Sequence, residues 1–274
     1  MARRGARPWI SLPPSIGPGG REGRCGSGNS KLQIANGKLQ IADGRARLDV
    51  YRLLSYPLGA TSPVWPGNPP AARTEPLSSI GRGSWANTTL LHLFSHSGTH
   101  VDAPKHFNDV GPAAAELPIE AFIFSRPCVV ETPKPEGGFI MRAELEPHRA
   151  ALRQADLCLL RTGWSSLRSA DPDRYARQGP LLHPDAGRFL VEDCPSLRGV
   201  AIDAISIGSP GYPAESVAVH HVLTGLGRPD GRFLLIFEDL RIDPDLGQAR
   251  RIYAWPLFVE DSDGSPCVIV AEFK

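Results

Sequence analysis

The chain has 274 residues, of which 41% are apolar and 22% are charged, so a largely disordered protein is excluded and a folded core is expected. Thirty basic residues against twenty-nine acidic ones give a net charge of +1, which removes the electrostatic case for a dedicated nucleic-acid-binding protein. The 28 glycines and 27 prolines predict many turns and argue against an all-helical bundle.

Residues 1–45 differ in composition from the rest of the chain. Gly, Arg, Ser and Pro predominate as far as Ser30, and a seven-residue near-repeat follows, KLQIANG and then KLQIADG. Two copies, each ending in glycine, are too few and too broken for a coiled coil. We therefore predict a low-complexity, disordered tail, or a translation start placed too far upstream, with a basic tethering arm as the alternative.

The remaining residues, 46–274, are expected to form one domain in which short apolar runs alternate with turn signals. The pattern predicts strands over residues 88–94, 128–131, 156–161, 199–207, 232–237, 257–260 and 267–273. It predicts helices over residues 143–154, 185–192 and 215–226. Continuous apolar strands indicate a sheet covered on both faces. Strands and helices are mixed without strict alternation, so the predicted class is mixed α/β, with a largely β core and flanking helices.

The five cysteines are scattered, and no two stand at CxxC spacing, so neither a zinc ribbon nor a disulfide framework is indicated. The simplest interpretation is a reduced, cytoplasmic chain whose thiols are core or surface groups. No run of eighteen apolar residues exists, so no membrane-spanning helix is predicted. Pro13 and Pro14 interrupt the apolar stretch near the N-terminus, so no signal peptide is expected.

The densest chemical signal is residues 96–106, HSGTHVDAPKH, which contain three histidines and an aspartate directly after a predicted strand. Imidazole and carboxylate are the ligands that divalent zinc, manganese or iron take. His100 and Asp102 stand two apart, so an extended backbone points both to the same face. Gly98 permits a bend that brings His96 round to join them. The spacing predicts three ligands on one metal, with a fourth group held close by.

These eleven residues resemble the H-x-G-T-H-x-D-x-P-x-H signature of the cyclase family, which includes bacterial metal-dependent kynurenine formamidases and isatin hydrolases. The resemblance extends to residues 63–70 (PVWPGNPP), 159–164 (LLRTGW) and 199–203 (GVAID), and covers roughly residues 48–274. It implies a cyclase-like fold, a swivelling β/β/α arrangement, and a homo-oligomer, either a dimer or a tetramer.

By position, the resemblance implies that His96, His100 and Asp102 hold a divalent metal, zinc or manganese, and that Asp102 bridges to a second ion where two are present. His106 resembles the family's catalytic base. A bound metal lowers the pKa of water to about 7, and a histidine with a pKa of about 6.5 can take up the released proton. A fourth metal ligand and an outer residue that orients a ligand are alternative roles for His106.

The family completes its second metal site with a histidine on a helix and a glutamate at the end of the following strand. The resemblance places these at His220 and Glu238. The family spaces this pair more closely, and the additional residues are expected to form the turn at 228–232. This departure leaves His221 as an alternative to His220.

Two further residues draw attention on their own. Trp65 is expected either to form an aromatic wall against a planar substrate or to be an ordinary core tryptophan. Asp203 lies within a predicted strand, where a buried structural hydrogen bond is more common than a role in orienting a metal ligand.

As the resemblance implies, we expect a metal-dependent hydrolase that acts on the carbon–nitrogen bond of a small amide. Arylformamidase activity, which converts N-formylkynurenine to kynurenine and formate in tryptophan catabolism, is the best-known activity of such proteins, and relatives open cyclic amides. A non-catalytic metal- or ligand-binding module and a metal-dependent lyase or dehydratase are the alternatives. The chain has neither a GxSxG elbow nor a glycine-rich phosphate loop, which argues against serine hydrolases and nucleotide-binding enzymes.

Overall fold

The computed structural model describes residues 31–35, 38–42 and 51–273, with side chains from Tyr51 onwards. The chain divides into two compact units, Met1–Arg47 and Leu48–Lys274. In the first unit the two copies of the near-repeat form β1 (Lys31–Ala35) and β2 (Lys38–Ala42), which pair antiparallel. The rest of the expected tail lies outside the described residues, so its nature stays a prediction.

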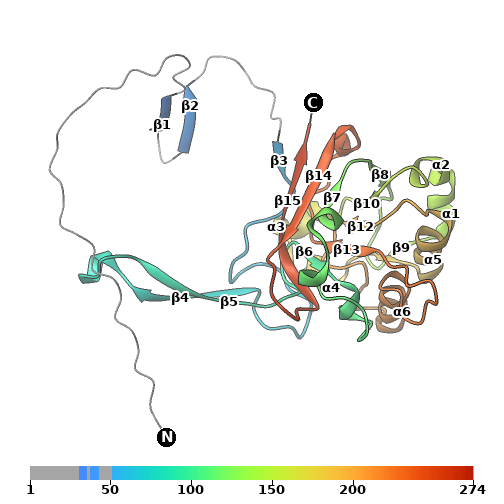
Figure 1. Ribbon diagram of the computed structural model, residues 1–274, viewed down its shortest axis with the longest axis horizontal. Coiled ribbons are helices and arrows are strands. Elements are labelled where there is room, and N and C mark those ends of the chain that lie inside the picture. The colour runs from blue at the N-terminus through green and yellow to red at the C-terminus, as the bar shows by residue number, and fades with distance from the viewer. Residues whose placement is uncertain (1–30, 36–37, 43–50, 274) are drawn as a thin grey trace, which may run out of the picture. The chain divides into compact units, whose positions relative to one another are not determined.

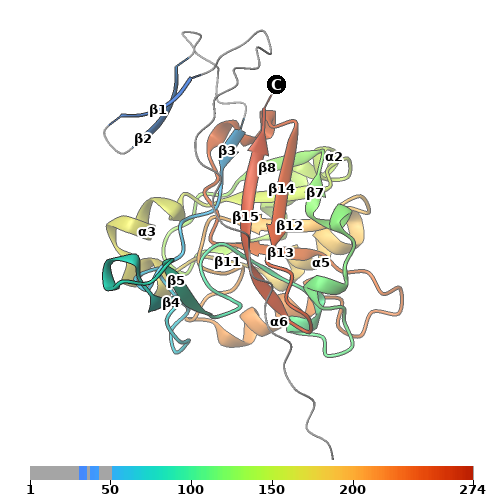
Figure 2. The same ribbon diagram turned by 60° about the vertical axis from the view of Figure 1, so that its left-hand side comes forward.

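A nine-stranded mixed sheet forms the centre of the second unit (Figure 1). Eight of its strands follow in the order β7, β14, β15, β6, β13, β12, β10 and β8. The ninth strand, β3, pairs with β15 and lies outside this order. The bounds are Tyr51–Leu53 (β3), His100–Asp102 (β6), Ile123–Phe124 (β7), Pro127–Glu131 (β8), Leu157–Arg161 (β10), Gly199–Ile202 (β12), Leu235–Glu238 (β13), Arg251–Pro256 (β14) and Gly264–Glu272 (β15). The strands β8, β10, β12 and β13 are parallel, and the others are antiparallel to their neighbours. Figure 2 shows β3, β15 and β14 side by side.

Two smaller strand pairs and short helices complete the second unit. The ribbon of β4 (Ala72–Ser78) and β5 (Thr88–Leu93) is antiparallel, and β9 (Phe139–Ile140) pairs parallel with β11 (Leu181–Leu182). The α-helices are Arg142–Leu145 (α1), Arg149–Leu152 (α2), Leu167–Ala170 (α3), Pro172–Arg177 (α4), Pro184–Asp193 (α5) and Pro213–Leu223 (α6). The 3-10 helices are Ile80–Arg82, Pro104–His106, Ala114–Glu116, Ile119–Phe122, Glu146–His148, Trp164–Ser166 and Pro244–Gln248. No helix in the described part of the chain has the length and apolar content that a membrane span needs.

Both faces of the parallel strands are buried, as their continuous apolar sequences predict. In β10, Cys158 and Leu160 point into a cluster that α5 and α6 complete, whereas Leu157 and Leu159 point into a second cluster shared with β14 and β15. Alternate side chains of one strand therefore enter two cores, because successive residues of a strand face opposite sides. The mixed α/β class with a largely β core is confirmed.

Three of the predicted elements differ from the structure. The strand predicted over 199–207 ends at Ile202, where Asp203 turns its carboxylate to accept hydrogen bonds from backbone N–H groups after β10. This is the structural role expected for Asp203. The helix predicted over 143–154 is broken into α1 and α2, because Pro147 lacks the N–H that a continuous helix needs.

The strand predicted over 257–260 is wrong. The paired segment is β14, which ends at Pro256, and the apolar residues after it lie in an exposed segment that leads into a turn at 260–261. Strand propensity depends on a partner strand, and residues 257–260 have no ladder partner in the described structure. The other predicted elements are present with bounds shifted by three residues or fewer. No prediction covered the strands β1, β2, β3, β4, β6, β7, β9, β11 and β14 or the helices α3 and α4.

A buried ion pair fixes the end of β13. Asp239 directly follows β13, is fully buried and has a left-handed backbone with φ 56°. Its carboxylate accepts hydrogen bonds from Arg168 at 2.6 and 2.7 Å and from the Tyr175 hydroxyl at 2.6 Å. Its backbone oxygen accepts a hydrogen bond from the Thr99 hydroxyl at 2.6 Å. The end of β13 is thereby tied to the residue that precedes β6.

We expect Asp239→Ala to lower the free energy of unfolding by about 3–5 kcal/mol, because it leaves the buried Arg168 guanidinium without its partner. Urea unfolding of the purified variant measures this loss. Asp173→Ala removes an exposed ion pair with Arg177 and serves as the control, with an expected change of about 0–1 kcal/mol. Similar losses in the two variants would show that the buried pair adds nothing special to stability.

Candidate functional site

Strand β6 carries two of the predicted ligands and lies between β13 and β15. Its antiparallel register with β13 places His100 directly opposite Glu238, and Asp102 lies two residues further along β6. Residues directly opposite in adjacent strands share a face, and so do residues two apart in one strand. The sheet itself therefore turns all three side chains to the same side.

His96 reaches this side through a bend, as predicted. Gly98 has φ 59°, a conformation that glycine adopts without strain. The His96 ring then places Nδ1 2.7 Å from Asp102 Oδ1. Gly264, the first residue of β15, lies opposite Asp102 in the ladder, and a Cβ there would collide with the His96 ring.

The helix α6 supplies the last imidazole. His220, which is 5% exposed, has its Nε2 3.6 Å from Asp102 Oδ2 and 3.6 Å from Glu238 Oε1. His221 is absent from the lining of the cavity described below, and its ring packs near Phe107 with centroids 5.7 Å apart. The structure brings His220, and not His221, to the carboxylates.

Two of the histidines are oriented by backbone carbonyls. His100 Nδ1 donates to Gly98 O at 2.8 Å, and His220 Nδ1 donates to Ser216 O at 2.6 Å. A neutral imidazole carries one N–H, so each Nε2 is left with a free lone pair that faces the carboxylates. Metal-binding histidines are held in this way by an outer acceptor.

The donor set fits a divalent cation. His100 Nε2 is buried and has no hydrogen-bond partner among the described residues, although it lies 3.3 Å from both Asp102 Oδ1 and Glu238 Oε2. Unpaired buried polar atoms are rare in native proteins and need an explanation. Buried carboxylates beside free imidazole lone pairs are the ligands that zinc and manganese take, and a bound cation would satisfy them all.

When they are protonated, the imidazoles also keep the carboxylates ionised. Burial acts to raise the pKa of Asp102, but the neighbouring imidazoles, His106 first, outweigh it and hold this pKa well below its usual value. Burial and the Asp102 charge act to raise the pKa of Glu238, but the contacts with His100 and His220 lower it to about 2. Both carboxylates are therefore negatively charged at neutral pH, as metal ligands must be.

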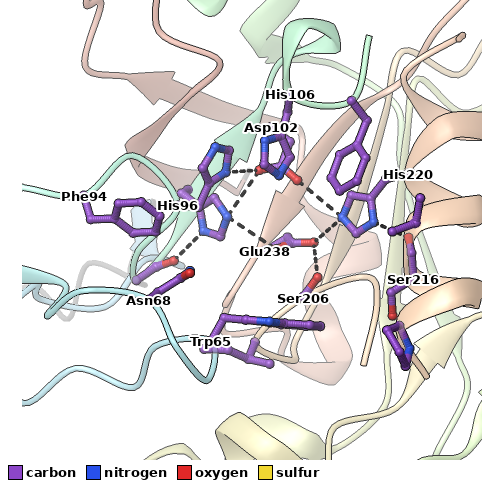
Figure 3. A pocket seen from close by; sticks show the side chains of 16 residues that line it. Trp65, Asn68, Phe94, His96, Asp102, His106, Ser206, Ser216, His220 and Glu238 are labelled. Carbon is purple, nitrogen blue, oxygen red and sulfur yellow. Dashed lines mark hydrogen bonds and ion pairs between the residues drawn. The ribbon is translucent and has the colours of Figure 1, made fainter. Parts of the chain in front are cut away.

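His106 lies at the end of the 3-10 turn Pro104–His106 and faces the same space. Its ring stacks on that of His96 with centroids 3.7 Å apart. Its Nδ1 lies 2.9 Å from Asp263 Oδ2. The five predicted metal ligands and the predicted base His106 thus come together, from the 96–106 segment, α6 and β13 (Figure 3).

A cavity of about 300 Å³ opens beside these groups. Apolar side chains form much of its wall, namely Trp65, Phe94, Phe107, Ile205, Pro213 and Val217. Trp65 both lines the cavity and packs against the first core cluster, so the two roles considered for it are compatible. The cavity joins polar groups that could hold a metal ion to an apolar surface suited to a planar or aromatic molecule.

Sequence reasoning missed two polar residues that contact the predicted ligands. Ser206 donates its hydroxyl to Glu238 Oε1 at 2.8 Å. Asp263 Oδ2 lies 2.8 Å from His96 Nε2. Asp263 is 157 residues from His106, and its Asp-Gly sequence is an ordinary turn signal, so nothing local pointed to a site.

Comparisons with known proteins agree with this geometry. The profile of a family described as putative cyclase matches residues 53–209. A kynurenine formamidase from Maricaulis maris is 31% identical over 201 residues, which cover 69% of this chain and 90% of that protein. One from Bacillus mycoides is 29% identical over 213 residues, covering 78% and 92%. The solved structure of isatin hydrolase A from Labrenzia aggregata has a TM-score of 0.67 at 23% identity, covering 81% of this chain and 93% of that one, and so shares its fold.

Proposed function

The chain belongs to the cyclase family, and we propose that it is a metal-dependent hydrolase that cleaves the carbon–nitrogen bond of an amide. The observation that carries this proposal is the buried His100 Nε2, which has no hydrogen-bond partner among the described residues and lies 3.3 Å from each of two buried carboxylates, beside an apolar cavity. The similarity to kynurenine formamidases supports the same reaction, because a formamidase is an enzyme that hydrolyses an amide.

The metal is zinc or manganese, as one or two ions. His96, His100 and Asp102 would hold the first ion, and His220 and Glu238, together with Asp102, would hold a second ion where two are present. Asp102 supports this sharing because its Oδ1 faces His96 and its Oδ2 faces His220. When bound, a divalent cation lowers the pKa of water to about 7 and polarises a carbonyl oxygen.

His106 is the general base. It accepts a proton at Nε2 from the attacking water and later gives a proton to the leaving nitrogen, so that an acid and an amine are released. Its Nδ1 is already engaged by Asp263, which leaves Nε2 as the acceptor. If His106 were instead a metal ligand or a residue that orients one, a variant without its ring would bind less metal.

The substrate is an aromatic amide, N-formylkynurenine or a related cyclic amide. The aromatic side chains of Trp65, Phe94 and Phe107 in the cavity wall support a planar substrate. No specific feature favours the binding-module or the lyase alternative. The homo-oligomer, dimer or tetramer, and the cytoplasmic location remain predictions.

We expect a chelator to abolish turnover and added zinc or manganese to restore it, because the ligands lose the cation that activates water. Formate release from N-formylkynurenine and opening of the isatin ring measure turnover, and mass spectrometry of the protein measures bound metal. Failure to bind either ion in excess would overturn the proposal. An unsaturated product without added water would identify a lyase, and ligand binding without turnover would identify a binding module.

A further inference from the structure

Asp263 joins two imidazoles of the site. Its Oδ2 lies 2.8 Å from His96 Nε2 and 2.9 Å from His106 Nδ1. Because the two rings are stacked, with centroids 3.7 Å apart, one carboxylate oxygen can accept a hydrogen bond from the edge of each. Within residues 51–273, the structure shows no other hydrogen bond to the His106 ring.

The backbone around Asp263 is anchored to the strand that carries the ligands. Ala103, directly after β6, donates its N–H to Asp263 O at 3.0 Å. The next residue, Gly264, pairs with Asp102 in the ladder. A Cβ on Gly264 would lie 2.7 Å from Val101 O and would collide with His96, so only glycine permits this close approach. The ladder therefore fixes where the Asp263 carboxylate lies relative to both rings.

We propose that Asp263 is a positioning residue that holds His106 in the Nδ1–H tautomer and thereby leaves its Nε2 free to accept a proton. In a neutral imidazole, the hydrogen bond at one nitrogen decides which nitrogen carries the proton. A carboxylate accepts only, so Asp263 requires the N–H to be at Nδ1. The inference deepens the proposed function, on which it rests for the catalytic role of His106.

The same oxygen orients a metal ligand. With Nε2–H of His96 donated to Asp263, His96 Nδ1 is the nitrogen that faces Asp102, at 2.7 Å. An outer carboxylate that receives the second N–H of a ligand histidine is a recurrent arrangement at metal sites. Asp263 therefore couples the orientation of the ligand His96 to that of the base His106. Asp263 itself belongs to neither of the two groups of described side chains that lie close enough to share an ion.

The test compares three full-length variants with the wild type. Asp263→Ala removes the acceptor, Asp263→Asn keeps an acceptor oxygen, and Asp261→Ala is the control from the same loop. The Asp261 side chain is 88% exposed and pairs with Lys105, away from the cavity lining. The measurements are kcat and KM for whichever amide the wild type hydrolyses, bound metal by mass spectrometry, and the ring nitrogen shifts of His106 by NMR in metal-free protein.

We expect Asp263→Ala to lower kcat by about 10–100-fold with little change in KM and with the metal retained. Asp263→Asn should recover most of kcat, and Asp261→Ala should match the wild type. In the NMR spectra, His106 should carry its proton on Nδ1 in the wild type and shift towards the Nε2–H form in Asp263→Ala.

Wild-type kcat and an unchanged tautomer in Asp263→Ala would overturn the inference while leaving the proposed function intact. Loss of metal in both Asp263 variants would also overturn it, because the loss of turnover would then follow from weaker metal binding and not from the tautomer of His106. If the wild type hydrolyses no amide but the tautomer shifts as expected, the positioning of His106 is supported and the proposed function fails.

Discussion

The Asp102→Asn variant is expected to bind little or no metal and to lose almost all turnover. Asp102 is the carboxylate that faces both His96 and His220, and it belongs to both groups of described side chains that lie close enough to share an ion. Asparagine keeps the size of the side chain but removes the negative charge that offsets the charge of a cation. We expect kcat/KM to fall by more than the roughly 10–100-fold that the loss of an outer partner costs.

Metal content and kcat/KM of the purified variant measure this effect. Asp156→Asn is the matched control, because Asp156 is also buried but accepts hydrogen bonds from the backbone of Ser125 and Arg126, remote from the cavity lining. The control should keep its metal and its activity. A metal-loaded, active Asp102→Asn protein would show that the ion, if one binds, does not lie where the ligands converge.

The His106→Ala variant is expected to retain its metal and to lose about 10²–10⁴-fold in kcat. General base catalysis by a positioned side chain contributes this much, and alanine has no group that can carry the proton. The ring lines the cavity and stacks on His96, so its removal opens space without removing a predicted ligand. Kinetics with the preferred amide, together with metal analysis of the same sample, measure both quantities.

The paired variants His220→Ala and His221→Ala provide the comparison. We expect His220→Ala to lose metal, because its Nε2 faces both carboxylates, and His221→Ala to keep both metal and activity. If His106→Ala loses metal in the manner of His220→Ala, His106 is a ligand and another group must serve as the base. If it keeps full activity, the base role is excluded outright.

The convergence of those proposed ligands that lie close in sequence was predictable from their spacing. A period of two puts His100 and Asp102 on one face of a strand, and a glycine allows the bend that His96 needs; both are local backbone properties. His220 and Glu238 were reached only through resemblance to a family, because no local pattern relates a helix residue to a strand 18 residues later. The choice between His220 and His221 required the orientation of α6 against the sheet.

The errors in the predicted strands share one cause. The predicted strand at 257–260 and the long strand at 199–207 were inferred from apolar composition, which records burial or propensity but not the presence of a partner strand. The short strand β6, which carries the proposed ligands His100 and Asp102, was missed because three residues are too few to show the alternation of apolar and polar side chains that marks a strand. Its existence depends on β13 and β15 on either side of it.

By itself, the sequence determined the sheet-rich α/β class and indicated the proposed ligands in residues 96–102, since hydrophobic patterning and the spacing of His and Asp side chains are local properties of the chain. The tertiary structure alone decided which histidine of α6 meets the carboxylates, and it alone brought Asp263 to His106. Such contacts join residues more than a hundred positions apart, and only the register of antiparallel strands and the packing of a helix on a sheet fix distances of that kind.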